Sequence, residues 1–193
     1  TLNALQSLYE ATERWEELHE LLGLWLQQAG SSEERIGIRI RLARLAEQKF
    51  GKLDQAIAQL RDILEEDSEN REALDELERL YEAGSLWEEL SSFLSKRAEA
   101  AAAAGGNAGE IAILLRLSEV FEQKLSDNAR ATETYKRVVE RDPENVGALN
   151  ALAALYQKGG EWEQTVAVLQ NLFALLRGEE AVAMAYRIAD LAA

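Results

Sequence analysis

Cysteine is absent from this chain of 193 residues, so it has no disulfide framework, no thiolate nucleophile and no cysteine ligand for a metal. The lack of disulfides fits a reducing compartment and favours a cytoplasmic location. No stretch approaches the roughly 18 consecutive apolar residues of a membrane helix, and no charged segment followed by an apolar one marks a signal peptide. We therefore expect no membrane partner.

Histidine occurs once, and catalytic chemistry has little else to use. His19 lies within a predicted helix, and a general base needs an oriented partner, so we interpret it as a partly exposed surface residue. The glycines at 105–106 lack the following Lys-Ser/Thr of a phosphate loop. The acidic clusters at 65–67 and 179–180 lack the Asp/Asn alternation and the glycine of a calcium loop. The sequence thus predicts no enzyme activity, no cofactor and no metal.

Basic residues are in the minority: 21 Lys and Arg stand against 35 Asp and Glu, for a formal net charge of −14. Phosphate binding requires local positive charge, so we expect no nucleic-acid partner, and the charge argues against an RNA-binding helical repeat. Proline occurs once, while Ala, Leu and Glu are abundant, which favours an all-α chain.

The stretch 129–162 has the pattern of helix, turn, helix. Its first helix places three residues on one face at i, i+4 and i+7: Ala131, Tyr135 and Val138. Pro143 then ends this helix and opens the next, with Asp142 as the predicted N-cap. The second helix carries a further apolar face: Leu149, Leu152, Leu155 and Tyr156. The glycines at 159–160 close the unit.

The rest of the chain repeats this unit in two alternating forms, so the true period is a pair of units. In one form, Leu5, Leu8, Tyr9, Trp15 and Leu18 return at a constant interval as Leu77, Leu80, Tyr81, Trp87 and Leu90. In the other, Leu42, Ala46, Lys49, Ala56, Leu60 and Asp67 return in the same way as Leu117, Phe121, Lys124, Ala131, Tyr135 and Asp142. Aromatic residues at matching positions indicate repeat packing, and we expect Trp25 and Phe173 in the core as well.

The last full unit resembles a tetratricopeptide repeat. The residues that carry the resemblance are Leu152, Ala153, Tyr156, Trp162, Thr165, Leu169 and Leu172, with Pro143 closing the repeat before. The resemblance implies an all-α, right-handed superhelical solenoid of antiparallel helix pairs. It also implies a protein–protein interaction scaffold, in which the first helix of each pair lines a concave groove. It covers essentially the whole chain, so we expect one repeat domain over 1–193.

We expect about five helix pairs and one terminal helix. The predicted helices are 2–12, 15–29, 32–49, 53–66, 70–83, 86–104, 108–125, 127–141, 144–158, 161–176 and 179–192. They group into repeats at 1–30, 31–69, 70–105, 106–144 and 145–177, followed by the terminal helix at 178–193. Because both chain ends fall inside the repeat register, we expect a fragment of a longer protein.

Two small residues let the helices of a tetratricopeptide repeat approach closely, and three repeats keep them. These pairs are Ala43 with Ala56, Ser118 with Ala131, and Ala153 with Thr165. Two repeats replace both members, with Gln6 opposite Leu18 and Glu78 opposite Leu90. We expect the leucines to fill a wider gap between the helices of those two pairs.

A row of arginines is the candidate partner-binding site. Arg41, Arg116 and Arg187 occupy the same repeat position and follow Ile40, Leu115 and Tyr186, while Arg44 and Arg79 lie one turn further along such helices. In the family these positions resemble groove-facing ones, and arginine beside an exposed apolar residue is typical of a binding hot spot. The family's Lys/Asn clamp for a peptide C-terminus is not visible. We expect a partner protein or peptide that mixes acidic and apolar residues.

Three alternatives stay open. The arginines fit equally an internal ladder of ion pairs with Asp75, Glu76 and Glu119. The chain fits a self-assembling structural module, because the terminal helix has an uncovered apolar face and thus a means of forming a homo-oligomer. It also fits a regulatory domain cut from a larger protein.

Overall fold

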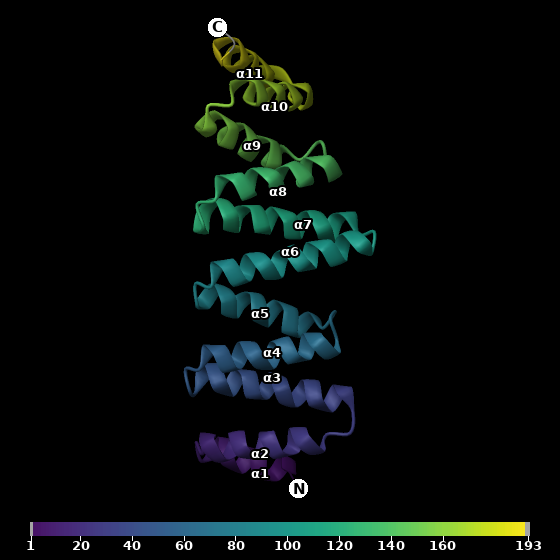
Figure 1. Ribbon diagram of the computed structural model, residues 1–193, viewed down its shortest axis with the longest axis vertical. Helices are drawn as coiled ribbons and strands as arrows, with labels where there is room; N and C mark the ends of the chain where they lie inside the picture. The colour runs from purple at the N-terminus through teal and green to yellow at the C-terminus, as the bar shows by residue number, and fades with distance from the viewer. Residues whose placement is uncertain (1, 192–193) are drawn as a thin grey trace. The chain divides into compact units, whose positions relative to one another are not determined.

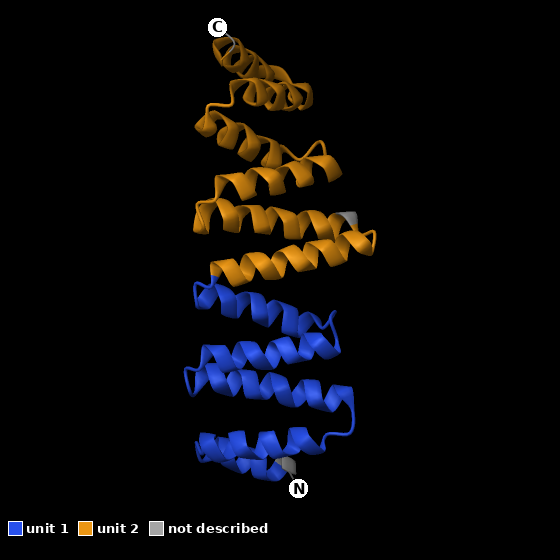
Figure 2. Cartoon of the chain, viewed as in Figure 1, with its two compact units in different colours: residues 1–86 blue, residues 87–193 orange. Residues whose placement is uncertain are grey.

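The computed structural model describes residues 2–191, and this part of the chain forms eleven α-helices and one π-helical turn, without a strand (Figure 1). The predicted all-α repeat fold is confirmed. The helices fall into two compact units, residues 1–86 and 87–193 (Figure 2). Within each unit, successive helices are antiparallel neighbours joined by short turns. The expectation of one repeat domain with the boundaries given above stays a prediction.

The first unit holds helices α1 to α5. Their bounds are α1 Leu2–Ala11, α2 Trp15–Gln28, α3 Ser32–Gln48, α4 Leu53–Glu66 and α5 Arg71–Ala83. The second unit holds α6 to α11 with the π-helical turn η1. Their bounds are α6 Trp87–Ala103, α7 Asn107–Glu119, η1 Val120–Lys124, α8 Asn128–Arg141, α9 Val146–Gly159, α10 Trp162–Leu175 and α11 Gly178–Leu191. The predicted helix ends agree with these to within a few residues, except that η1 forms the end of the seventh predicted helix.

Side-chain caps begin several helices. Ser31 accepts a hydrogen bond from the Glu34 amide at 3.2 Å, and Asn145 accepts one from the Ala148 amide at 3.0 Å. The prediction that Asp142 is the N-cap of α9 is therefore wrong. Asp142 ends α8 and instead accepts a hydrogen bond from the Asn145 side chain at 2.9 Å. The chain needs two further residues after Pro143 to complete the turn, so the cap falls on Asn145.

A left-handed residue ends the first helix of every pair. These residues are Glu13, Gly51, Ser85, Ser126 and Gly160, with φ of 54°, 62°, 54°, 54° and 74°. Only glycine adopts this conformation without steric cost, because it has no Cβ. Three of the five turns nevertheless place a residue with a side chain there.

In each unit the core lies between adjacent helices. The small residues expected at close approaches are buried, among them Ala56, Ser118 and Thr165 at 0% exposure, and so are Leu18 at 4% and Leu90 at 0%. The wider spacing proposed for the leucine pairs stays a prediction. Not every aromatic residue is in the core: Phe173 is 43% exposed and Trp162 is 51% exposed, against expectation.

Candidate functional site

Arg41 and Arg44 line an open pocket of about 360 Å³ between α1, α2 and α3 in the first unit. We call it the α1–α3 pocket. Its apolar wall comes from Trp15, Leu18, Leu22 and Leu45, and its polar rim from Gln6, Glu10, Arg41, Arg44, Gln48 and Lys49. Three cations face one carboxylate around this pocket, although the chain as a whole carries a net charge of −14. The pocket therefore combines local positive charge with apolar surface.

Two cations of the α1–α3 pocket have only neutral partners. Arg41 Nη1 donates to Gln6 Oε1 at 2.8 Å, and the Arg41 guanidinium lies 5.8 Å from the ring centroid of Trp25. Lys49 Nζ lies 4.3 Å from the ring centroid of Trp15. Within residues 4–106 and 108–191, whose side chains are described, neither cation pairs with a carboxylate. Their charge is thus available to an anionic group, and the aromatic contacts hold both side chains at the pocket.

Arg44 and Arg79 form ion pairs between helices. Arg44 Nη2 lies 2.7 Å from Glu72 Oε1, with side-chain exposures of 51% and 49%. Arg79 is held more firmly, because it bonds to Glu47 at 2.6 Å and to Glu76 at 2.8 Å. The hydrogen bond from Arg79 lowers the pKa of the Glu47 carboxyl. Arg79 thus makes the contact to Glu76 that an internal ladder requires.

The arginines of the second unit are also bonded within the protein. Arg116 Nη1 donates to Glu119 Oε2 at 3.3 Å, and Arg187 Nη2 donates to Gln157 Oε1 at 3.1 Å. Asp75, the third carboxylate expected in a ladder, lies beside Arg71 instead, at 4.0 Å.

The apolar residues expected between the arginines differ widely in exposure. Ile40 is only 8% exposed, so the expectation that it faces a partner is wrong. Leu115 is half-buried. Tyr186 is 75% exposed, and it lies in a cleft between α10 and α11 together with Phe173. The three residues share a repeat position, but the elements packed around that position differ along the chain.

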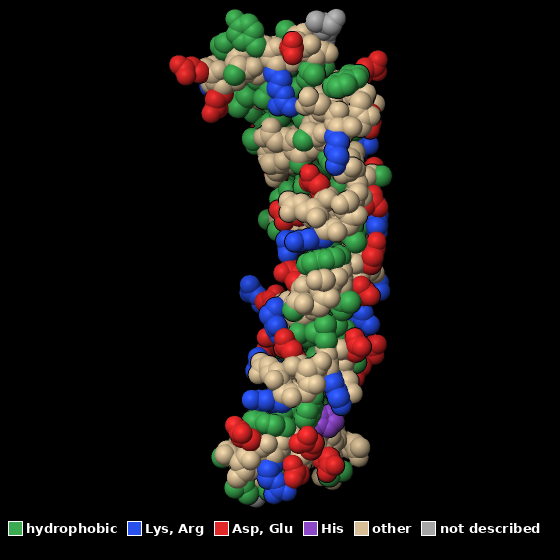
Figure 3. All heavy atoms as spheres, turned by 90° about the vertical axis from the view of Figure 1, so that its left-hand side faces the viewer, with side chains coloured by type: hydrophobic (Ala, Val, Ile, Leu, Met, Phe, Trp, Pro, Cys, Tyr) green, Lys and Arg blue, Asp and Glu red, His purple; other side chains and the backbone are tan. Residues whose placement is uncertain are grey.

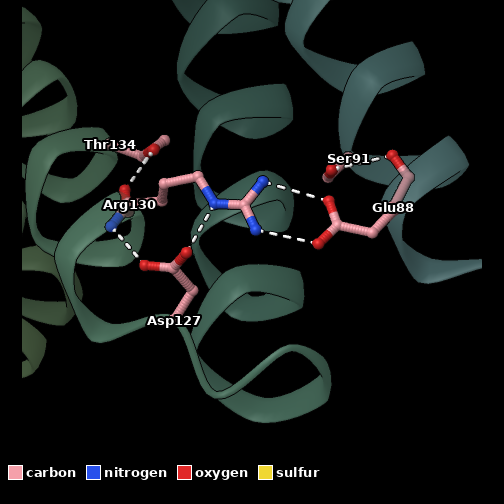
Figure 4. Close-up of polar contacts among 5 residues, drawn as sticks. All are labelled: Glu88, Ser91, Asp127, Arg130 and Thr134. Carbon is pink, nitrogen blue, oxygen red and sulfur yellow. Dashed lines mark hydrogen bonds and ion pairs between the residues drawn. The ribbon is translucent and has the colours of Figure 1, made fainter.

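Arg130 illustrates an arginine that is already paired with two carboxylates (Figure 4). Its guanidinium donates to both oxygens of Glu88, at 3.0 and 2.9 Å, and its Nε donates to Asp127 at 2.6 Å. The guanidinium also lies 4.6 Å from the ring centroid of Phe121. Glu88 is 42 residues away along the chain, so this contact could not be inferred from the local sequence.

The surface shows no extended block of one charge sign on the face drawn in Figure 3, where acidic and basic side chains are interspersed with apolar side chains between them. No group of acidic or histidine side chains among the described residues has the arrangement of a metal site.

Within the same residues, none of the helices combines the length and the apolar composition needed to span a bilayer. His19 is exposed, as predicted, with its ring 5.8 Å from that of Phe50.

Two stretches of the sequence, residues 112–145 and 134–167, match families described as tetratricopeptide repeat. This region of the chain is similar to tetratricopeptide repeats. The two stretches together run from within α7 through η1, α8 and α9 to the first part of α10. Tetratricopeptide repeats serve in general as protein-interaction scaffolds and are generally non-catalytic.

Solved structures of low sequence identity resemble this chain. MamA AMB-1 shares the fold: it is 17% identical, with 94% of each chain covered and a TM-score of 0.51. A tetratricopeptide repeat protein from Parabacteroides merdae is 15% identical, with 98% of this chain and 70% of that chain covered and a TM-score of 0.49. BtubC from P. vanneervenii is 15% identical, with 97% and 80% covered and a TM-score of 0.49. No curated protein sequence matches this chain.

Proposed function

We propose that this chain is an interaction scaffold whose first unit binds a partner segment of mixed acidic and apolar residues in the α1–α3 pocket. The observation that carries the proposal is the placement of Arg41, Arg44 and Lys49 around apolar surface in a strongly acidic chain. Guanidinium groups bind carboxylates with two parallel hydrogen bonds, and an ammonium group adds a point charge. The matching ligand therefore carries a carboxylate next to a bulky apolar side chain.

The existing contacts leave the pocket open to such a ligand. The hydrogen bond from Arg41 to Gln6 has a neutral acceptor, so a carboxylate competes with Gln6 on favourable terms. The Arg44–Glu72 pair is half-exposed on both sides, and pairs of this kind contribute little to stability. An arriving carboxylate can therefore replace Glu72 at small cost. The acidic remainder of the surface repels acidic segments elsewhere and favours binding at the pocket.

Arg116, Arg187 and Leu115 remain proposed contact residues of the second unit. Arg116 and Arg187 are partly or fully exposed and make bonds of 3.3 and 3.1 Å to surface side chains. Arg79 has two carboxylate partners at 2.6 and 2.8 Å, so we assign it a structural role in the first unit. Ile40 is buried and drops out of the proposed site.

A titration with synthetic peptides tests the proposal. One short peptide alternates glutamate with leucine, and its control replaces each glutamate with lysine. We expect the acidic peptide to bind, and Arg41→Glu to weaken its binding by about 2 kcal/mol, roughly a thirtyfold rise in Kd. Arg71→Glu makes the same charge change at a side chain that is 94% exposed and outside the pocket, so it should change Kd by less than about twofold.

The proposal fails if both peptides bind equally, or if Arg41→Glu and Arg71→Glu have the same effect. Far-ultraviolet circular dichroism of each variant verifies that its helices are intact. Raising the salt concentration gives an independent check, because contacts between partly exposed charges weaken with screening.

A further inference from the structure

Helices α3, α7 and α11 occupy equivalent places in the repeat. They begin at Ser32, Asn107 and Gly178, and the intervals between these starts equal the intervals between the arginines at 41, 116 and 187. Residues at these intervals therefore lie on the same helical face. The helix that packs on a given face of α3 or α7 therefore indicates which kind of element can pack on the same face of α11.

On α3 and α7, one face receives the second helix of the pair. Arg35 and Arg39 of α3 form ion pairs with Glu66 and Asp62 of α4. Glu110 of α7 pairs with Arg141 of α8 at 3.3 Å. Each pair joins two helices that run in opposite directions, since residues near the start of the first helix meet residues near the end of the second.

The same face of α7 is fully covered. Under α8, Glu110 is 2% exposed, and Leu114 and Ser118 are both 0% exposed. The packing of α8 therefore removes all three positions from solvent.

The corresponding positions on α11 are Ala181, Ala185 and Ala189, of which Ala181 is partly buried while Ala185 and Ala189 are exposed. They line an apolar cleft of about 430 Å³ together with Phe173, Val182 and Tyr186, which are 43%, 57% and 75% exposed. We call this the α10–α11 cleft. A neighbouring face of α11 packs through Met184, Ile188 and Leu191 on a buried cluster formed by α9 and α10.

We propose that the α10–α11 cleft binds an amphipathic helix of a partner protein, seated on α11 as α4 is on α3 and α8 is on α7. The cleft lies in a different unit from the α1–α3 pocket and uses none of its residues. The inference is thus separate from the function proposed above.

The side chains of the cleft define the chemistry of the partner helix. The three alanines are small and uncharged, where α3 and α7 carry Arg35, Arg39 and Glu110. The partner face must therefore be apolar along its length and bulky enough to fill the cleft. Because the helices run in opposite directions, its C-terminal end lies near Glu179 and Glu180 in the first turn of α11. Arginine or lysine in its last turn would satisfy these carboxylates and the helix dipole.

The same charges argue against a second copy of α11 as the occupant. The last turn of α11 contains no basic residue, and it carries Asp190. Two copies packed face to face in opposite directions would bring Asp190 of one near Glu179 and Glu180 of the other. Like charges at close range disfavour such a pair.

The test uses the whole chain and a synthetic amphipathic helix of about five turns, with leucines on one face and two arginines in its last turn. We expect saturable binding in fluorescence anisotropy. Ala185→Glu places a charge in the centre of the cleft and should weaken binding at least about tenfold. Ala183→Glu adds the same charge on the same helix outside the cleft and should change Kd by less than about twofold. Arg41→Glu should have no effect here, whatever it does at the α1–α3 pocket.

A second peptide, with the two arginines changed to glutamate, tests the predicted orientation and should bind several-fold more weakly. The proposal is overturned if the arginine peptide does not bind, or if Ala185→Glu binds it as well as the unmodified chain does. It is also overturned if sedimentation shows a dimer that Ala185→Glu dissociates, since a second copy would then cover the cleft.

Discussion

Glu110 on α7 and Arg141 on α8 form the same inter-helix ion pair as Arg35 and Glu66 at the equivalent positions of an earlier repeat, with the two charges exchanged. The repeats thus preserve the contact while reversing its polarity. The two pairs also differ in burial, because Glu110 is 2% exposed whereas the Arg35 side chain is 35% exposed. A buried carboxylate depends more on its partner than an exposed guanidinium does.

Removing that partner should destabilise the second unit. Arg141→Ala leaves the Glu110 carboxylate buried without its cation, and we expect a loss of about 2 kcal/mol in the free energy of unfolding. Chemical denaturation followed by circular dichroism measures it. Exchanging the pair, as Glu110→Arg with Arg141→Glu, should recover more than half of the loss. The repeats suggest that this contact works with the charges in either order. That interpretation fails if the protein with the exchanged pair is no more stable than Arg141→Ala alone.

Glycine should stabilise the turns that place a side chain in the left-handed conformation. Ser126 has φ of 54°, and its equivalent in the earlier repeat is Gly51. Ser126→Gly relieves the Cβ strain, and we expect a gain of about 1 kcal/mol in thermal or denaturant unfolding. Ser68→Gly, at an exposed turn residue without positive φ, serves as the control and should bring no gain. Equal effects at the two sites would refute the strain argument.

Leu90 should contribute to the stability of the fold as a buried core residue does. It is 0% exposed, so Leu90→Ala should create a cavity and cost about 2–5 kcal/mol in the free energy of unfolding. Leu24 is 58% exposed, and Leu24→Ala should cost less than about 0.5 kcal/mol. A near-neutral result for Leu90→Ala would contradict its assignment as the side chain that compensates for the missing small residues.

Stability should fall with acidification below the ordinary pKa of glutamate. Hydrogen bonds from arginines lower the pKa of several carboxyls in the folded protein, among them Glu47, Glu66 and Glu88. Their folded-state pKa lies below the unfolded value of about 4.3. The stabilisation is thus present above that value and is lost as the pH falls through the lower, folded-state pKa. The melting temperature should drop between about pH 5 and pH 3.

The Glu47 contribution to this acid sensitivity can be isolated. Arg79→Gln removes the main cause of the lowered pKa of Glu47 and should reduce the pH dependence of the melting temperature. Arg71 is 94% exposed and 4.0 Å from its carboxylate, so Arg71→Gln should leave that dependence unchanged. A pH profile identical in all three proteins would show that the Arg79–Glu47 pair does not contribute.

Helix positions were predictable because they depend on local sequence. Apolar spacing and turn residues placed all eleven helices of residues 2–191, and repetition indicated the resemblance to tetratricopeptide repeats. The error at Asp142 arose because Pro143 allows several starts for α9, and only the geometry of the turn selects Asn145. The cap itself depends on backbone angles that the local sequence does not determine.

The candidate site was less accessible, because side-chain partners depend on how neighbouring helices are aligned. Arg41 meets Gln6, 35 residues away, and Arg79 meets Glu47, 32 residues away. Repeat position predicted neither partner. It also could not distinguish Ile40, which is buried, from Tyr186, which is exposed. Lys49, which completes the charge of the α1–α3 pocket, was missed, although its place four residues after Leu45 puts both on one face.

Arg130 ties three separate segments of the second unit together: the start of α6 through Glu88, the turn before α8 through Asp127, and η1 through the ring of Phe121. In a stack where each repeat touches only its neighbours, partial opening from one end is the normal route of unfolding. Because the Arg130 guanidinium contacts residues of two repeats, it raises the free energy of partial opening between them. The backbone amides of α6, α7 and α8 should consequently exchange their hydrogens with solvent as one cooperative block.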